Sequence, residues 1–218
     1  MFDINMNENI LSYFCFQIRA GAIKESTCAI ILRGVLKGID FLHSNGFIHQ
    51  NIKASKIFIG ENGEIKLSGL ETSSIEASIR RVASYVGTPY WMSPESILED
   101  SCTSKIDNWC LGITILELLF GNPPFYNVHP MRTIFLIASK EPPRLQGNSF
   151  SDEFKDFVHS CLTKDYKERP TTKQLLNHPF ILQAKDDISC FKSLIDDYLE
   201  FSRIVMDFKL YYESDEEY

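Results

Sequence analysis

The 218-residue sequence lacks the marks of several specialised classes of protein. It has no uninterrupted apolar run near the roughly 18 residues that a membrane-spanning helix requires. Its first residues, MFDINMNENI, lack the basic and apolar segments of a signal peptide. Its six cysteines form no C-x-x-C pair and no zinc-ligand spacing, which favours reduced thiols over disulfides. We therefore expect a cytoplasmic protein with no membrane partner.

The sequence also has no excess of basic residues. Its 22 Lys and Arg residues face 29 Asp and Glu residues, for a net charge of −7. Residues 186–218 contain 10 of the acidic and 3 of the basic residues, so the imbalance belongs to the C-terminal tail. Because no basic stripe is available to neutralise phosphates, we expect no nucleic-acid partner.

The composition that is present, 44% hydrophobic and 23% charged, is typical of a soluble globular domain with one sizeable core. Apolar residues at helical spacing predict several helices. Their ranges are 25–44, 107–120, 130–139, 151–163 and 171–177.

Three other segments have distinct patterns. Short apolar runs at 57–59 and 65–67 flank a Glu-Asn-Gly turn and predict a pair of strands. Residues 71–90 are polar and aperiodic, as in a long functional loop. Residues 186–208 are amphipathic and predict a helix that either packs on the body or binds a partner.

Four strings carry a resemblance to a known family. They are IHQNIK at 48–53, GTPYWMSPE at 87–95, DNWCLGI at 107–113 and KERPT at 167–171. In this order and at these spacings they resemble a eukaryotic protein kinase, over about residues 8–182. GTPYWM is similar to the sterile-20-like (germinal-centre) serine/threonine kinases, which include the mammalian sterile-twenty kinases and the kinase domains of class III myosins.

The resemblance covers only the C-terminal lobe of that family. It implies a mainly α fold, with short β-strands around the catalytic loop and no N-terminal β lobe. We expect an N-terminal leader over 1–7, the kinase-like lobe over 8–182, and an acidic C-terminal helix and tail over 183–218.

The resemblance also implies that the catalytic groups are degenerate. In the family's H-R-D-x-K-x-x-N loop, the Asp accepts the substrate's proton and the Asn holds magnesium. Here Asn51 stands at the base position, Lys53 matches the lysine, and Lys56 stands at the metal-ligand position. Gly69 stands where the Asp of D-F-G would hold magnesium. The family uses ATP and magnesium, whereas we expect no cofactor and no metal site in this chain.

Other matching positions are structural in this interpretation. Glu95 and Arg169 resemble a buried ion pair of the family, and Asp107 matches an aspartate that binds the catalytic-loop backbone. His49 matches a core histidine. Thr88 and Lys53 match residues beside the catalytic Asp, and with Asn51 between them we expect them to hold the loop in shape.

Two positions in the 71–90 loop leave alternatives open. Ser84 falls where the family carries its activating phosphothreonine, so it is a candidate phosphosite. The arginine that pairs with such a phosphate is Gln50 here, which favours an ordinary loop serine. Glu71 is the carboxylate nearest the D-F-G position, and a metal-ligand role would require it to act from a displaced position.

These observations leave three hypotheses about function. The first is a catalytically inactive kinase-like protein that binds protein partners, for instance another kinase, near residues 84–95 or through the acidic tail. The second is a serine/threonine kinase that uses displaced groups and an N-lobe supplied elsewhere. The third is a truncated fragment without function.

Overall fold

The computed structural model describes residues 23–60, 63–69, 89–98, 103–147, 149–185 and 189–192. Two long helices form the centre of this part of the chain: α2 (Glu25–Ser44) and α5 (Lys105–Phe120). Apolar side chains from both helices belong to one hydrophobic core. The loop that carries the sequence-predicted site lies between them in the chain.

The helix α2 forms where its apolar stripe predicts it. Lys24, at the N-cap, makes no side-chain hydrogen bond, in line with the lack of a capping box. Glu25 instead accepts hydrogen bonds from the backbone N–H and the hydroxyl of Ser151, which joins the start of α2 to the start of the helix at 152. Gly46 adopts a left-handed φ of 77° just beyond the helix, where the chain reverses. The buried positions of α2 recur at steps of three and four: Cys28, Ile31, Leu32, Val35, Leu36, Ile39 and Leu42.

The helix α5 is buried on every side. All residues from Ile106 to Leu119 are buried, so the helix has no solvent-facing stripe. Gly112 allows a close helix contact, because a Cβ there would lie 2.7 Å from the side chain of Leu162. Gly121 ends the helix in a left-handed conformation with a φ of 82°. A helix this deeply buried gives the residues attached to it fixed positions.

Shorter elements surround this centre. The sequence predicted α6 (Pro130–Ser139), α7 (Asp152–Cys161) and α8 (Thr172–Leu176). Ser151 caps α7, and Thr171 forms a capping box with Gln174 at α8. The sequence did not predict four elements of one turn each: η2 (Ala54–Lys56), η4 (Pro89–Trp91), α4 (Pro94–Ile97) and α9 (Pro179–Leu182).

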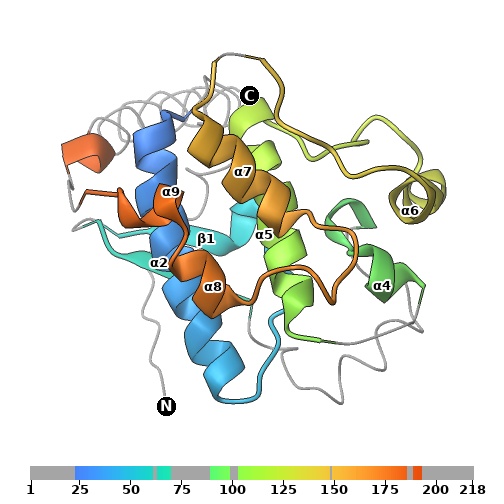
Figure 1. Cartoon of the computed structure of the whole chain (residues 1–218), viewed down its shortest axis with the longest axis horizontal. Helices are drawn as coiled ribbons and strands as arrows, with labels where there is room; N and C mark the ends of the chain where they lie inside the picture. Colours follow the sequence, from blue (N-terminus) through green and yellow to red (C-terminus); the bar gives the residue numbers. More distant parts are fainter. Residues whose placement is uncertain are drawn as a thin grey trace, which may run out of the picture.

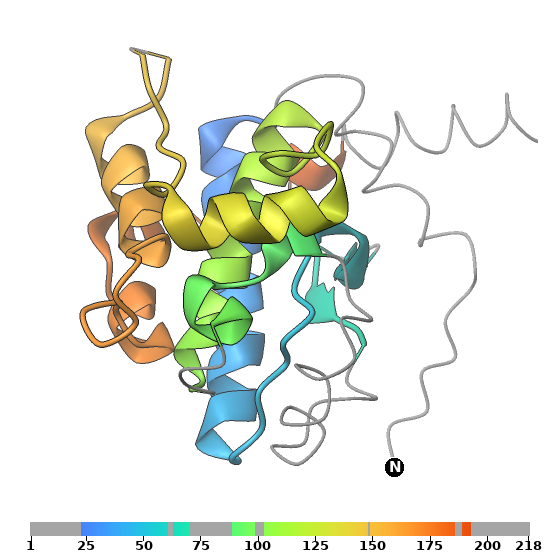
Figure 2. The same ribbon diagram turned by 90° about the vertical axis from the view of Figure 1, so that its right-hand side faces the viewer.

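The elements lie on different sides of the central helices. In Figure 1, α7, α8 and α9 lie together, while α4 and α6 lie on the opposite side of α5. Figure 2 shows α2 and α5 between the α7–α9 group and the strands β1 (Ile57–Ile59) and β2 (Ile65–Leu67). Contacts of α2 with α8, α9 and β2, and of α5 with α7, agree with this arrangement.

The two strands are antiparallel and short. Ile57 pairs with Leu67 and Ile59 with Ile65, which confirms the predicted hairpin. The strand β2 packs on α2 at Gly34, where a Cβ would lie 2.6 Å from the Cβ of Ile65. The hairpin joins the end of the preceding loop, where the backbone N–H of Ser68 donates to the carbonyl of Lys56.

The described part of the chain is mainly helical, as predicted. Three predictions lie outside it: the start of the lobe at 8–22, the loop over 71–88, and the tail beyond residue 192. Of the predicted helix at 186–208, residues 189–192 are helical and the side chain of Phe191 is buried in the core. Within the described residues, no helix combines the length and the apolar character that crossing a bilayer requires.

The cysteines of the described part have free thiols: Cys28, Cys110, Cys161 and Cys190. Burial raises the pKa of Cys28 to about 12, and the nearby Glu25 carboxylate adds to this effect. Burial raises the pKa of Cys110 and of Cys161 further still. These three buried thiols therefore stay protonated and act as core residues.

Candidate functional site

The backbone of the catalytic-loop segment is held by Asp107, which is fully buried. Its Oδ2 accepts a hydrogen bond from the backbone N–H of His49 (2.8 Å), and its Oδ1 accepts one from Gln50 (2.6 Å). Gln50 has a φ of +61°, a conformation that costs a non-glycine residue about 1–3 kcal/mol. The two hydrogen bonds to a charged acceptor offset this strain, so α5 imposes the shape of the loop.

His49 joins the same loop to the end of β2. Its Nε2–H donates to the carbonyl of Ser68 (2.8 Å), and its Nδ1 accepts from the backbone N–H of Asn51 (3.2 Å). Because one ring nitrogen donates and the other accepts, this ring is the neutral Nε2–H tautomer. The imidazole is fully buried and has no open position for a ligand. These contacts agree with the structural role that the resemblance implies for it.

The two positions at which the family holds magnesium, Lys56 and Gly69, lie together. The first of them carries a positive charge in this chain. A Cβ built on Gly69 would lie 3.2 Å from Cδ and Cε of Lys56 and 3.4 Å from its Nζ. The ammonium of Lys56 therefore stands beside the place where the family's carboxylate would be. Within the described residues, no group of three or more His, Cys, Asp or Glu side chains could hold a metal.

These residues do not fit a magnesium ion. Magnesium requires oxygen ligands, whereas Lys56 offers only N–H donors and Gly69 has no side chain. Asn51, half-buried at the base position, carries a neutral amide that cannot accept a proton at neutral pH. The site as built has neither a general base nor a metal-binding carboxylate in the described part.

Glu117 is a site residue that the sequence analysis missed. Its Oε2 accepts hydrogen bonds from the backbone N–H of Ala54 and from Nε1 of Trp91, both at 2.9 Å. Burial raises the pKa of Glu117 above 4.5, although the two hydrogen bonds and the nearby Lys53 ammonium act in the opposite direction. Lys53 lies 5.8 Å from the centroid of the Trp91 ring. A carboxylate within the apolar run from Trp109 to Phe120 was the signal for this role.

Glu95 and Arg169 form a buried bidentate ion pair, the contact that the resemblance implies. The guanidinium nitrogens lie 2.6 and 3.0 Å from the two carboxylate oxygens. Arg169 also donates to the carbonyls of Thr163 and Lys105. Its guanidinium lies 5.1 Å from the centroid of the Trp109 ring. This pair therefore joins α4, α5 and the loop before α8.

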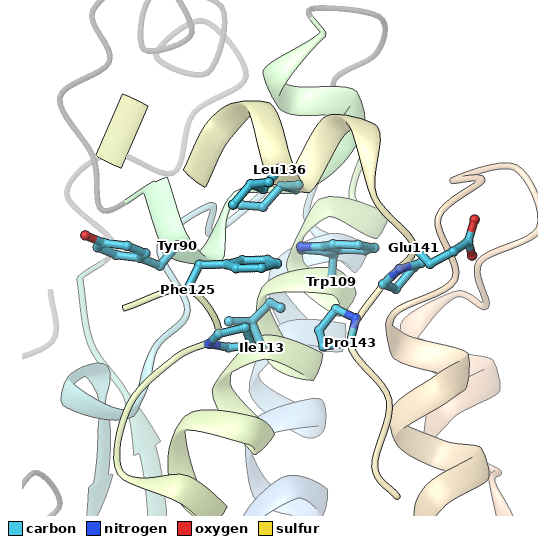
Figure 3. A pocket seen from close by; sticks show the side chains of 10 residues that line it. Tyr90, Trp109, Ile113, Phe125, Leu136, Glu141 and Pro143 are labelled. Atoms are coloured by element: carbon cyan, nitrogen blue, oxygen red, sulfur yellow. The ribbon is translucent and has the colours of Figure 1, made fainter. Parts of the chain in front are cut away.

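A small apolar hollow, partly open to solvent, lies between η4, α5 and α6. Figure 3 shows the rings of Tyr90, Trp109 and Phe125 around it, with the Glu141 carboxylate directed away. The indole N–H of Trp109 is buried and has no hydrogen-bond partner within the described residues.

Thr88, Ser84 and Glu71 lie outside the described residues, and their predicted roles stay predictions. Of the other sequence-predicted residues, the structure brings His49, Asn51 and Asp107 together at the loop. It brings Lys56 and Gly69 together beside that loop. Glu95 and Arg169 form a separate buried cluster.

The sequence profile of the protein kinase domain family matches residues 3–181. The chain belongs to this family. It is 46% identical over 176 residues to the serine/threonine-protein kinase dst1 of Dictyostelium discoideum, an alignment that covers 80% of this chain and 24% of that protein. This kinase domain is also 41% identical to Misshapen-like kinase 1 of Rattus norvegicus over 169 residues, 75% of this chain and 13% of the relative.

A third relative is the serine/threonine-protein kinase TAO1-B of Xenopus laevis, 40% identical over 174 residues, 78% of this chain and 17% of the relative. These relatives place the kinase domain in the sterile-20-like group, as its GTPYWM string predicted. The chain spans less than a quarter of the length of each relative. The family and fold are therefore established.

Proposed function

We propose that this sterile-20-like kinase domain transfers no phosphoryl group and acts as a protein-binding scaffold or regulator in signalling. The observation that carries the proposal is the Lys56 ammonium beside Gly69, at the two positions where the family binds magnesium. A fixed cation there repels a divalent cation, and Asn51 offers no base. Each such loss typically lowers a rate by orders of magnitude, and these losses affect the same chemical step.

The groups that maintain the shape of the lobe are present, which supports a role based on shape. Asp107 still holds the loop backbone, and the ion pair of Glu95 and Arg169 is complete. These contacts lie near the first turn of α5, and none of them involves a nucleotide. A domain that keeps its framework while its reacting groups are replaced retains a surface for partners.

The partner surface that we propose lies over η4 and α6. Large apolar side chains are exposed there: Tyr126 (52%), Met131 (61%) and Phe135 (75%). The Tyr126 ring lies 6.1 Å from that of Tyr90, within the 84–95 region that the family analogy favours. We propose a protein, for instance another kinase, as the partner, with the acidic residues 186–218 as the alternative contact region.

A phosphate-transfer assay tests the catalytic part of the proposal. The full chain is incubated with radiolabelled ATP, magnesium or manganese, and a general kinase substrate, and we expect no transfer above background. The matched variant restores the family's groups through Asn51→Asp, Lys56→Asn and Gly69→Asp together. Transfer by the unmodified chain that disappears in Lys53→Met would refute the proposal.

A serine/threonine kinase is the second candidate, favoured by the 46% identity to dst1 and by the presence of Lys53. It would require a displaced carboxylate to replace the base. Glu117 is a buried carboxylate near the loop, but its Oε2 is already occupied by Ala54 and Trp91. The same transfer assay with Glu117→Gln tests this candidate, because an enzyme that used Glu117 as its base would lose activity in that variant.

A fragment without function is the third candidate. A lobe that has lost the lobe it packs against exposes apolar surface, so a fragment without function should be prone to aggregate. Sedimentation of the purified chain distinguishes the cases, because a scaffold is expected to stay soluble and monodisperse. Affinity capture with and without residues 186–218 then tests the acidic region, and unchanged capture would exclude it as the contact.

A further inference from the structure

The small hollow between η4, α5 and α6 contains an unpaired hydrogen-bond donor. Trp109 is 2% exposed, and its buried Nε1–H has no acceptor among the described residues. Figure 3 shows the ring nitrogen of Trp109 at the edge that faces the ring of Phe125, another wall of the hollow. A buried donor without an acceptor is costly and rare in native structures. An acceptor supplied by another molecule would remove this cost.

The other tryptophan shows that this fold can satisfy such a donor. Nε1 of Trp91 donates to Oε2 of Glu117 at 2.9 Å. The chain has two tryptophans, so one indole is paired within the described residues and the other is not. The one hydroxyl among the lining side chains, that of Tyr90, donates to the carbonyl of Val128 and is directed away from Trp109 in Figure 3. The lining side chains therefore offer no acceptor to the Trp109 indole.

A wall of the hollow also carries backbone strain. Phe125 has a φ of +65°, a left-handed conformation that residues other than glycine rarely adopt. Such residues persist only where the surrounding structure enforces them, and they cluster at ligand clamps and switch regions. Phe125 is half-buried, and it lines the hollow. The unpaired donor and the strained residue are independent features that meet in one place.

The chemistry of the hollow selects the kind of acceptor. Its volume of about 10 Å³ has room for roughly one water-sized group, so only the tip of a ligand enters it. A water molecule would find one free partner among the lining side chains, Trp109, whereas a buried water typically makes about three hydrogen bonds. An anion would lose its hydration without gaining a cation, because the one charged lining residue is Glu141. A neutral carbonyl oxygen, which only accepts, matches the donor.

The walls of the hollow indicate which carbonyl would bind. They consist mostly of aromatic rings and prolines: Tyr90, Trp109, Phe125, Pro124, Pro142 and Pro143. Proline-rich segments in the polyproline II conformation dock in aromatic-lined grooves and present carbonyls that have no internal hydrogen bonds. Proline also has no N–H, so its docking on an apolar wall buries no unmatched donor. We propose that the hollow binds an extended proline-rich segment of a protein partner, one main-chain carbonyl of which accepts a hydrogen bond from Nε1–H of Trp109.

This inference rests on the proposed function, and it names the chemistry of the partner. The hollow lies beside the proposed partner surface, because Tyr90 lines it and the Tyr90 ring lies 6.1 Å from that of the exposed Tyr126. Leu136 of α6 lines the hollow and is the chain neighbour of the exposed Phe135. A segment anchored in the hollow would therefore also lie against these exposed apolar side chains.

NMR of the full chain labelled with ¹⁵N at its tryptophan indoles tests the proposal directly. The two tryptophans give two indole N–H signals, and Trp91→Phe assigns them. Addition of hexaproline with acetylated and amidated ends should move the Trp109 signal downfield to a saturating value, because a new acceptor deshields the proton. The Trp91 signal should stay in place, since its donor is already bound to Glu117. A Gly-Ser hexapeptide with the same ends is the control probe and should cause a smaller shift at equal concentration.

Two substitutions on α6 separate the hollow from the helix surface. Leu136→Phe adds bulk to a lining side chain and should abolish the shift caused by hexaproline. Arg132→Phe introduces the same residue at an exposed position that does not line the hollow, and it should leave the shift unchanged. Trp109→Phe removes the donor and should weaken hexaproline binding, measured by calorimetry, about two- to tenfold, the range that one net hydrogen bond supplies. If Trp109→Phe does not fold, the contrast between the two α6 variants carries the test.

Three results would overturn the inference. The first is a Trp109 signal that hexaproline does not move, including one that already has the shift of a hydrogen-bonded indole because an ordered water occupies the hollow. The second is an equal shift with both peptides, and the third is a shift that persists in Leu136→Phe. None of these results bears on catalysis, which the phosphate-transfer assay tests separately. Capture of a partner over η4 and α6 without hexaproline binding would refute the proline chemistry and leave the proposed partner surface standing.

Discussion

At the scale of single residues, Glu117 shows how one buried carboxylate joins separate segments. Its Oε2 accepts from Ala54 in the loop and from Trp91 in η4, so a single oxygen holds both segments on α5. The side chain is 9% exposed, and ionisation therefore costs solvation that the two hydrogen bonds only partly restore. The contact and its electrostatic cost can be separated by experiment.

We expect Glu117→Gln to alter the pH dependence of stability. Because burial raises the pKa of Glu117 in the folded state, the folded protein binds a proton more tightly than the unfolded chain does. The stability of the unmodified protein relative to Glu117→Gln should therefore fall as the pH rises from about 4.5 toward neutrality. The amide oxygen of Gln can still accept from both donors, so the variant should fold.

Urea unfolding at several pH values measures this difference. Glu117→Leu, which accepts no hydrogen bond, should cost about 1–3 kcal/mol at every pH because two buried N–H groups lose their acceptor. Glu141→Gln, at an exposed position, is the control and should change stability by less than about 0.5 kcal/mol. A pH-independent difference between the unmodified chain and Glu117→Gln would show that the carboxylate is not destabilised by burial.

The ion pair of Glu95 and Arg169 provides a second test at this scale. Removing one partner leaves a buried charge, so Arg169→Met should destabilise the fold by about 3–5 kcal/mol. The double variant Glu95→Gln and Arg169→Met should recover part of this loss, because no uncompensated charge is left. Denaturant unfolding of the unmodified chain, the two single variants Glu95→Gln and Arg169→Met, and the double variant measures the coupling, and strictly additive losses would indicate that the charges do not act as a pair.

At the scale of elements, two glycines of α2 make a matched comparison. A Cβ at Gly34 would lie 2.6 Å from the Cβ of Ile65, whereas one at Gly38 would have nothing within 4 Å. Gly34→Ala should therefore push β2 away from α2 and destabilise the fold by about 1–3 kcal/mol. Gly38→Ala should stabilise it by up to about 1 kcal/mol through helix propensity. Thermal unfolding of both variants checks the contrast, and equal effects would mean that the contact with β2 is loose.

The longer elements could be predicted because their signal is carried by many residues. The stripe of α2 repeats over twenty residues, and α5 is apolar throughout. The four-residue helices α4 and α9 were not predicted, because one turn carries no measurable period and each is fixed by its cap and by packing. Lys105 was placed outside α5, since a lysine adds nothing to an apolar pattern.

The sequence predicted the candidate site only at positions that match a motif of the family. Asn51, Lys56 and Gly69 were identified through motif positions, but the approach of the Lys56 side chain to Gly69 is a feature of the fold. The role of Glu117 depends on Ala54 and Trp91, which lie 63 and 26 residues away in the chain. The contact of the Thr172 hydroxyl with Nδ1 of His43, 129 residues away in the chain, likewise depends on packing that no local pattern encodes.

At the scale of the whole molecule, retained and lost features occupy different places. The retained contacts, those of Asp107, Glu95 and Arg169, are centred on the first turns of α5 and the loop before α8. The replaced groups, Lys56 and Gly69, lie at the ends of η2 and β2. Under the proposed function, framework and chemistry have therefore changed separately.

This separation leads to a prediction about ligand binding by the whole chain. We expect ATP with magnesium to leave the melting temperature unchanged, because the proposed inactive lobe has the Lys56 ammonium at a position where the family binds the metal. A ligand present at 100 times its dissociation constant would stabilise the folded state by about 2.7 kcal/mol. For a domain of this size that corresponds to a rise of about 5–10 °C, well within the resolution of differential scanning fluorimetry.

The control for this measurement is the variant that combines Asn51→Asp, Lys56→Asn and Gly69→Asp. Because Gly69 has a φ of +91°, Gly69→Asp also strains the backbone, so the melting temperature of the variant without ligand is the baseline for its own comparison. If the lysine and the glycine are what prevent binding, the variant should gain a magnesium-dependent rise above that baseline. A rise in the unmodified chain that requires magnesium and disappears in Lys53→Met would mean that nucleotide and metal bind despite the Lys56 ammonium. In that case the proposal that Lys56 excludes the metal would be wrong, and the inactive interpretation would rest on Asn51 alone.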